Sequence, residues 1–315
     1  MEKISVVTPI YNERGNLEEL VQRLQDVFST LQKPYEIIAV DDGSKDGSFE
    51  LLEKLAKKDV HLKVISFQTN KGQTAALSAG IERATGDIIV TMDSDLENDP
   101  ADIPQLLLKL DEGFDVVSGW RRTRWQGKFL TRKLPSILAN KLISRITRLP
   151  LHDFGCILKA YRREVIEDVK LYGEMHRFIP AHASWHGARV TEIPVSFSPR
   201  RYGVSKYGFS RTFRVLLDLV LLRFLDRYFT KPMHFFGGIG SISLLLGTLT
   251  ATLAVVLKII DVRDFVETPL PIFSALLLIV GIQLIVMGIL AEMQMRTYFE
   301  SQGKRPYRVM REINF

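Results

Sequence analysis

The first 120 residues alternate between short apolar runs and stretches in which apolar residues recur every three or four positions. The apolar runs have the lengths of strands and occupy residues 4–10, 35–40, 62–67, 87–92 and 115–119. The stretches between them have helical spacing, as in Leu17, Leu20, Val21, Leu24 and Val27. This alternation predicts a largely parallel sheet with both faces covered by helices. The predicted fold class is therefore α/β.

Beyond residue 119 the pattern changes to a basic, aromatic segment that ends in an amphipathic helix at about residues 130–148. Its apolar face would hold Leu134, Leu138, Leu142, Ile143 and Ile146. Such a helix either packs on the protein surface or lies at the surface of a bilayer. The segment 211–232 has the same amphipathic pattern. Because an apolar stretch follows it directly, the bilayer interpretation is favoured for both helices.

Two uncharged stretches, residues 236–257 and 271–291, are each long enough for a helix of about 20 residues that crosses a bilayer. Basic residues crowd their outer flanks, whereas the connecting segment holds two basic and three acidic residues. The positive-inside bias therefore predicts a cell-membrane protein with both termini in the cytoplasm. Two core helices of a soluble fold would need apolar surroundings that the chain does not supply. The predicted organisation is a cytosolic domain (1–210), a juxtamembrane helix (211–232), two spans (233–295) and a basic tail (296–315).

Composition narrows the functional classes only slightly. The net charge of +6 is modest for 315 residues and does not indicate a nucleic-acid partner. A single cysteine, Cys156, excludes an internal disulfide and fits a reducing compartment. The first apolar run is short and soon followed by polar residues, so it is interpreted as a strand rather than a signal peptide.

Acidic pairs follow two of the predicted strands: Asp41 and Asp42 close the second, and Asp93 and Asp95 close the fourth. Ligands of parallel sheets bind at the carboxyl ends of the strands. On an extended strand end, residues two apart point to the same side, so Asp93 and Asp95 would form half of a site for Mg²⁺ or Mn²⁺. Either pair is also compatible with a turn or a helix cap, and both interpretations can hold together.

Six motifs in this order resemble the family 2 glycosyltransferases: VVTPIYNE, VDDGSKDGS, NKGQTAALSAG, DIIVTMDSDLENDP, HDFGCILKAYRR and FSPRRYGVSKYGF. More narrowly, they resemble the polyprenyl-phosphate glycosyltransferases. These include dolichol-phosphate mannose synthase, the undecaprenyl-phosphate aminoarabinose transferases and the bactoprenol glucosyltransferases. The resemblance covers residues 4 to about 230, and the two-span tail is typical of bacterial members.

The resemblance implies a GT-A domain, a nucleotide-sugar donor and a polyprenyl phosphate acceptor at the membrane surface. The residues at the family's nucleoside positions are Pro9, Tyr11, Glu13, Asp41 and Asp42. Asp93 and Asp95 would face the ribose, the diphosphate and Mg²⁺ or Mn²⁺. Glu97, where many relatives have glutamine, would offer a further oxygen to the metal. The segment with Arg200, Ser205 and Lys206 matches a motif that handles phosphate groups.

The implied reaction is an inverting attack of a lipid phosphate on the anomeric carbon. Because the second pKa of a phosphate monoester is near 6, this nucleophile needs no base at neutral pH. Asp153 is therefore interpreted as an organiser of the sugar or acceptor, with a helix cap as the alternative. Arg121, Arg122 and Arg132 are candidates for holding the acceptor phosphate, and a solvated basic face is the competing interpretation for each.

The resemblance favours UDP as the nucleotide, undecaprenyl phosphate as the acceptor and glucose as the first expectation for the sugar. Mannose from GDP-mannose and an aminoarabinose-type sugar remain open, and the chain is compatible with a homo-oligomer. A processive polysaccharide synthase would carry glutamine where Arg121 stands and would need more spans. A non-catalytic membrane tether would predict a damaged metal motif, and a soluble nucleotidyltransferase would not need the tail.

Overall fold

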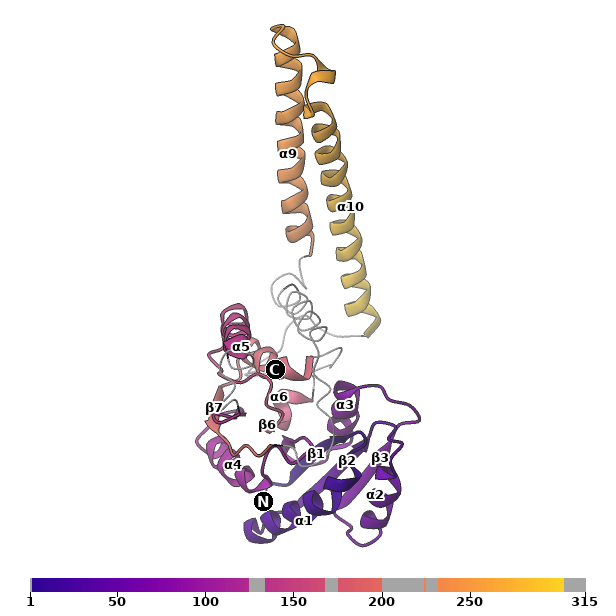
Figure 1. Cartoon of the computed structure of the whole chain (residues 1–315), viewed down its shortest axis with the longest axis vertical. Coiled ribbons are helices and arrows are strands. Elements are labelled where there is room, and N and C mark those ends of the chain that lie inside the picture. Colours follow the sequence, from indigo (N-terminus) through magenta and orange to yellow (C-terminus); the bar gives the residue numbers. More distant parts are fainter. Residues whose placement is uncertain (1, 125–133, 168–174, 200–223, 225–231, 303–315) are drawn as a thin grey trace, which may run out of the picture. The chain divides into compact units, whose positions relative to one another are not determined.

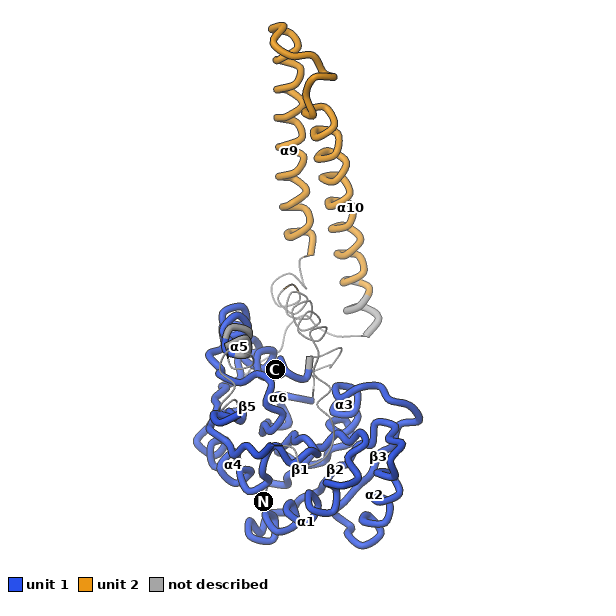
Figure 2. Tube along the Cα trace, in the orientation of Figure 1, with its two compact units in different colours: residues 1–220 blue, residues 221–315 orange. Residues whose placement is uncertain are grey.

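The computed structural model describes residues 2–124, 134–167, 175–199, 224 and 232–302. The chain forms two compact units, residues 1–220 and 221–315 (Figure 2). Four of the predicted site residues lie outside the described residues: Arg132, Arg200, Ser205 and Lys206. The same is true of nearly all of the predicted juxtamembrane helix, 211–232.

One seven-stranded sheet organises the first unit, with the strand order β3-β2-β1-β4-β6-β5-β7 (Figure 1). Five strands lie where the sequence predicts them: β1 (Ile4–Ile10), β2 (Tyr35–Asp41), β3 (Leu62–Ser66), β4 (Ile88–Thr91) and β5 (Val116–Trp120). Two more, β6 (Lys159–Arg162) and β7 (Val190–Pro194), are not predicted from the sequence. The largely parallel sheet is confirmed, with β6 as the exception because it runs antiparallel to both β4 and β5.

The reversed strand β6 decides which loops meet. Because it runs against its neighbours, β6 begins at the edge of the sheet where β4 and β5 end, which we call the carboxyl edge. Its first residue, Lys159, pairs with Thr91 of β4 and with Ser118 of β5. The turn that precedes β6 therefore lies at the same edge as the acidic motifs. This turn contains Asp153.

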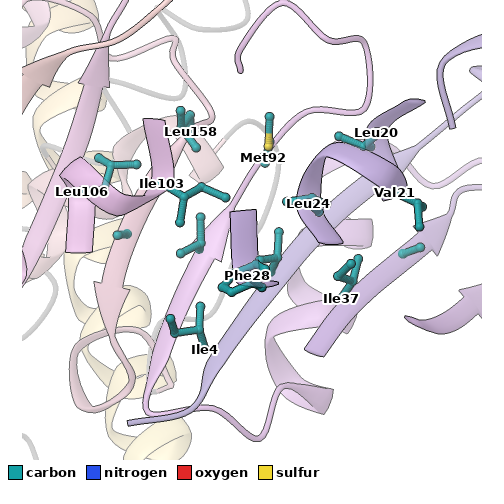
Figure 3. Close-up of a cluster of buried hydrophobic side chains, with 14 of the residues drawn as sticks. Ile4, Leu20, Val21, Leu24, Phe28, Ile37, Met92, Ile103, Leu106 and Leu158 are labelled. Atoms are coloured by element: carbon teal, nitrogen blue, oxygen red, sulfur yellow. The ribbon is translucent and has the colours of Figure 1, made fainter. Parts of the chain in front are cut away.

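Helices cover both faces of the sheet, as the continuous apolar strands require. One core is formed with α1 (Arg14–Leu31), α2 (Ser48–Ala56) and α4 (Ile103–Asp111), and Figure 3 shows part of it. The opposite core is formed with α3 (Gln73–Arg83), α6 (Arg163–Ile166) and α7 (Ile179–Trp185). Neighbouring strand residues alternate between the cores, so Val6 packs in the first and Val7 in the second. Two short 3₁₀ turns, Pro100–Asp102 and Met175–Phe178, lead into α4 and α7.

The amphipathic helix predicted at about 130–148 corresponds to α5 (Leu134–Thr147). Ile143 is buried, whereas Ile137 and Leu142 are 46% and 45% exposed. The indole nitrogen of Trp185 donates a hydrogen bond to the carbonyl of Thr147, which attaches the end of the helix to α7 (3.0 Å). One part of its apolar surface is thus packed and another part is exposed, and contact with a bilayer stays a prediction.

The second unit consists of two long helices that lie side by side, α9 (Pro232–Ile259) and α10 (Leu270–Gln302) (Figure 1). A 3₁₀ turn, Phe265–Glu267, lies in the connection. Both helices are long and apolar enough to cross a membrane, and only 17% of the most apolar 18-residue stretch of each helix is buried. Glycines hold them close, since a Cβ at Gly240 would lie 2.8 Å from the carbonyl oxygen of Gly281. Such exposed helices do not fit the alternative of a soluble core.

Candidate active site

Asp42, at the end of β2, shapes the loop that leads into α3. Its carboxylate is 3% exposed and accepts hydrogen bonds from the backbone N–H groups of Lys71 (2.6 Å) and Gly72 (2.9 Å) and from the Asn70 side chain (2.9 Å). The neighbouring Asp41 is 1% exposed and accepts hydrogen bonds from Ser44 and Ser66 (3.2 and 3.0 Å). Both carboxylates therefore build the loops around the expected nucleoside site.

Gly43 is required where these loops touch. Its φ is +71°, and a Cβ there would lie 2.8 Å from the backbone of Thr69 and Asn70. An L side chain would be strained by the left-handed backbone and would collide with main-chain atoms that cannot rotate away. The close approach of the two loops therefore depends on glycine.

Three nucleoside candidates lie at the end of β1 and in the loop that follows it. Pro9 is buried in β1, and its carbonyl accepts a hydrogen bond from the Ser94 hydroxyl (3.0 Å). Tyr11 is half-buried, and Glu13 precedes α1 and accepts a hydrogen bond from the Asn16 side chain (2.7 Å). Their contact with a nucleoside stays a prediction.

The DSD motif does not have the local geometry expected for it. β4 ends at Thr91, and the chain then turns, with Leu96 at φ +58°. The prediction of an extended strand end at Asp93 and Asp95 is therefore wrong. A left-handed backbone is unfavourable for leucine, and conformations of this kind cluster at functional sites. Asp95 is 4% exposed and accepts a hydrogen bond from the backbone N–H of Glu97 (3.0 Å), which stabilises the turn.

Gln73 links this loop to the nucleoside side of the site. It is the first residue of α3, and its side-chain amide donates a hydrogen bond to Asp93 (2.6 Å). Negative charge near a helix N-terminus is stabilised by the helix dipole. The sequence interpretation assigned no role to Gln73, although its place at the expected start of a helix between two acidic motifs was a usable signal.

The donor set suits a hard divalent cation that is completed by substrate. In the described ranges no group of three or more His, Cys, Asp or Glu side chains is placed to hold a metal. Two aspartates in the loop after β4 supply oxygen ligands, and Mg²⁺ usually completes its shell with water and substrate phosphates. Asp93 and Asp95 thus fit a metal that binds together with a diphosphate.

Glu97 is placed between this loop and two arginines. One of its carboxylate oxygens lies 3.6 Å from the guanidinium of Arg121 and 3.7 Å from that of Arg124. Its backbone carbonyl accepts a hydrogen bond from the N–H of Ser198 (2.9 Å). The extra negative charge relative to glutamine is therefore balanced by two guanidinium groups.

Arg121 and Asp153 form a buried ion pair with two parallel hydrogen bonds. The Nε and Nη2 atoms of Arg121 donate to the two carboxylate oxygens of Asp153 at 2.8 and 3.2 Å. The residues are only 4% and 9% exposed. Burial raises the pKa of Asp153, but the charge and hydrogen bonds of Arg121 outweigh it and hold the pKa below its usual value. An aspartate with a low pKa is a weak base, which favours an organising role.

The helix-cap alternative for Asp153 is wrong. Asp153 lies in the turn before β6, and its carboxylate accepts a hydrogen bond from the backbone N–H of Gly155 (3.0 Å). Lys159 stabilises the turn, because its buried ammonium donates hydrogen bonds to the backbone carbonyls of Phe154 and Cys156. Burial lowers the pKa of Lys159 to about 8, although the nearby Cys156 and Asp153 oppose that shift. The sequence interpretation missed Lys159, for which a lysine inside the apolar run CILKAY was the available signal.

The two arginines that follow β5 have different surroundings. Arg121 is buried against Asp153, whereas Arg122 is exposed, with its guanidinium 5.8 Å from the centre of the Trp120 ring. The ring of His152 also stacks on Trp120, at 4.4 Å between ring centres. Binding of the acceptor phosphate by either arginine stays a prediction.

The arrangement of the sheet and its acidic loops is that of a GT-A domain. The structure is similar to solved structures of glucosyl-3-phosphoglycerate synthase from Mycobacterium tuberculosis. One of these, a complex with Mn²⁺, UDP and phosphoglyceric acid, has a TM-score of 0.53 and 19% sequence identity and covers 70% of this chain and 78% of that one. Another has a TM-score of 0.54 and 20% identity, over 70% and 80% of the two chains. At this identity the similarity establishes the fold alone.

The family is established by sequence. The model of "Glycosyl transferase family 2" matches residues 5–170, and the chain belongs to this family. It is 43% identical, over 99% of its length and 93% of the relative, to dodecaprenyl-phosphate galacturonate synthase of Rhizobium johnstonii. It is 38% identical, over 99% and 94%, to undecaprenyl-phosphate 4-deoxy-4-formamido-L-arabinose transferase of Salmonella choleraesuis. The resemblance seen in the six motifs is confirmed, and the chain is a glycosyltransferase.

Proposed function

We propose that this protein transfers a sugar from a UDP-sugar to undecaprenyl phosphate, or another polyprenyl phosphate, at the cytoplasmic face of a membrane. The observation that carries the proposal is the meeting of two groups at the carboxyl edge of the sheet. The aspartate loop after β4 offers ligands for a metal diphosphate, and the Arg121–Asp153 pair lies beside it, linked through Glu97. The relatives named for polyprenyl-phosphate transfer support the same reaction.

The acceptor phosphate attacks the anomeric carbon with inversion, and its charge makes a general base unnecessary. Asp153 holds the guanidinium of Arg121 in place instead of accepting a proton. Arg122, Arg132 and the segment with Arg200, Ser205 and Lys206 supply donors for phosphate oxygens. A bound Mg²⁺ or Mn²⁺ would supply the positive charge that stabilises the departing diphosphate, and Asp93 and Asp95 would hold it.

The sugar in this proposal is galacturonate before glucose. Glucose is the expectation from the resemblance to the bactoprenol enzymes. The two relatives described above are named for galacturonate and for a 4-deoxy-4-formamido-arabinose, which favours a sugar of those kinds. The relative with 43% identity makes galacturonate the first choice and the formamido sugar the second.

A lipid acceptor requires the site to work at a bilayer, and the second unit supports this. The two apolar helices have the length of membrane spans. With both spans inserted as a hairpin, the basic residues outside them favour a cytoplasmic location for the two termini. The nucleotide sugar would then reach the first unit from the cytosol.

The experiment is a transfer assay with the purified full-length protein in detergent. It is incubated with undecaprenyl phosphate, Mg²⁺ or Mn²⁺ and one of four radiolabelled donors: UDP-galacturonate, UDP-4-deoxy-4-formamido-arabinose, UDP-glucose or GDP-mannose. We expect labelled lipid from the first donor, and loss of that product in Asp95→Asn, which removes ligand charge with little change of shape.

The matched control is Asp99→Asn in the same motif. Asp99 caps the 3₁₀ turn through the N–H of Ala101 and pairs with Arg23, which are contacts that asparagine can keep in part. Its transfer rate should stay within about threefold of the wild type, because surface ion pairs contribute little. Labelled lipid from no donor would refute the proposed transfer to undecaprenyl phosphate. Transfer by Asp95→Asn at the wild-type rate would refute the metal assignment alone.

A further inference from the structure

A polar side chain lies in the middle of the second apolar helix, on its outer face. Gln283 is at the centre of the span Leu270–Met295 and is exposed. Among the described residues, none makes a hydrogen bond with its amide. Hydroxyls in the first span differ, since Thr248 and Thr252 donate to carbonyls one turn earlier in their own helix (both 2.9 Å). Gln283 therefore has an unmet hydrogen-bonding capacity that these threonines do not have.

The face of α10 that carries Gln283 points away from α9. The opposite face of α10 packs on α9 through Gly281 and Gly288, where an added Cβ would lie 2.7 Å from Leu244 and 2.9 Å from Met233. Gln283 follows Gly281 by two residues, which is roughly 200° around a helix. The glutamine consequently cannot be satisfied by α9.

Apolar residues on both sides of Gln283 repeat with the spacing of a helix-pairing surface. We call this surface the outer seam, and its positions alternate at intervals of three and four residues: Leu276, Ile279, Gln283, Val286, Leu290 and Met293. Its five apolar members are 49–60% exposed. A repeat averaging 3.5 residues keeps one stripe in contact along a left-handed helix pair, and the six positions span about 26 Å at 1.5 Å per residue. That length matches the hydrocarbon core of a bilayer.

Hydrocarbon offers no donor or acceptor to an amide, so an isolated glutamine at this depth is strongly disfavoured. A second copy of the chain carries the same amide at the same depth. Each glutamine amide has both donor and acceptor groups, so two of them can exchange hydrogen bonds across a two-fold axis. A polar residue at one position of an apolar repeat also fixes the register of the pair.

We propose that the protein self-associates in the membrane through the outer seams of two α10 helices, with the Gln283 amides hydrogen-bonded to each other. The proposal rests on the membrane insertion that is part of the proposed function, and it does not depend on the sugar or on catalysis. The occupant of the seam is a second copy of this chain.

The first test measures association of the full-length protein in liposomes by energy transfer between two fluorescent labels at a range of protein-to-lipid ratios. Gln283→Leu keeps the size and removes the amide, and we expect association to weaken about 3- to 30-fold, the range for interhelical polar contacts in membranes. Gln283→Asn should restore part of it. Ile289→Leu, an exposed apolar change about 120° around the helix from Gln283, is the matched control and should have no effect.

The second test is disulfide formation between introduced cysteines. Because the native Cys156 is buried and has a raised thiol pKa of about 11, it should not interfere. Ile279→Cys and Val286→Cys, which lie in the outer seam and keep Gln283, should form cross-linked dimers, and Ile282→Cys and Ile289→Cys, on the flank of α10, should form few. A wild-type monomer at every lipid ratio, or equal cross-linking at all four positions, would overturn the proposal. Extraction by alkali would instead refute membrane insertion, and sugar transfer is measured separately on the same samples.

Discussion

The substitution Asp153→Asn separates an organising carboxylate from a general base. In the wild type the Asp153 carboxylate accepts two hydrogen bonds from Arg121, at 2.8 and 3.2 Å, in a site that is almost fully buried. Asparagine keeps one oxygen but turns an amino group towards the guanidinium. The substitution therefore leaves a buried arginine with half of its closest partner, while Glu97 remains 3.6 Å away.

Removing one member of a buried ion pair costs about 3–5 kcal/mol. Because Glu97 and the remaining amide oxygen compensate in part, we expect the free energy of unfolding to fall by about 3 kcal/mol. For a unit of 220 residues this lowers the Tm by about 6–12 °C. The control is Asp115→Asn, since Asp115 pairs in a similar two-bond geometry with Arg189, whose side chain is 65% exposed. Because the guanidinium of Arg189 is mostly in solvent, that pair should contribute less than about 1 kcal/mol.

The dependence of the transfer rate on pH gives the functional test. Since the pKa of Asp153 is held below its usual value, the carboxylate is charged throughout the neutral range, and its stabilising effect is lost only as the pH falls through that low pKa. Asp153→Asn should therefore lower kcat by the same factor at each pH between about 5.5 and 8.5. A wild-type loss of activity near pH 6 to 7 that disappears in the variant would refute this reasoning, as would an unchanged Tm.

Three further predictions concern other parts of the molecule. Burial raises the pKa of Glu36, but hydrogen bonds from Lys63, Ser5 and Thr85 outweigh it and lower the pKa. Its stabilising effect is complete above the unfolded pKa of about 4.3 and is lost as the pH falls from there through the lower folded pKa. Glu36→Gln should therefore be less stable than the wild type at pH 7 in chemical unfolding, and the gap should narrow towards pH 3. Gly43→Ala should lower the free energy of unfolding by at least about 1–2 kcal/mol, since the φ of +71° and the backbone of Asn70 leave no room for a Cβ. The same variant should bind UDP more weakly in calorimetry. Unchanged binding would show that these loops are not part of the nucleoside site. Reporters fused at each terminus should be cytoplasmic and a tag beside Asp264 accessible only from the opposite side; termini on opposite sides would mean that one span is misassigned.

The strands that sequence periodicity predicts are the ones buried on both faces. β1, β2 and β4 are continuous apolar runs because helices cover them on each side. β6 has only four residues and begins and ends with charged side chains, and β7 is a half-buried strand at the sheet edge, so neither has a clear pattern. The direction of β6 is also not encoded in its own periodicity. It follows from the pairing partners on both sides, which lie far away in the sequence.

The residues of the site also differ in how far the sequence predicts them. Asp93 and Asp95 are found from the sequence because they stand in one short motif after a recognisable strand. The contact between Arg121 and Asp153 joins residues 32 positions apart, across a segment with no predicted strand that would bring them together. The sequence interpretation made Asp153 an organiser of the sugar or acceptor and Arg121 a candidate for the acceptor phosphate, but it gave no indication that they bind each other.

Glu97 shows how this pairing changes the electrostatics of the loop that holds Asp93 and Asp95. From the sequence, a carboxylate in place of the glutamine of many relatives adds a negative charge close to Asp93 and Asp95. In the structure its carboxylate lies near Arg121 and Arg124, and Arg121 in turn contacts Asp153. The added charge is thus opposed by the guanidinium of Arg121, to which the turn before the reversed strand β6 brings Asp153. A change at Glu97 should consequently act on the Arg121–Asp153 pair as well as on the proposed metal site, because one buried guanidinium serves both carboxylates.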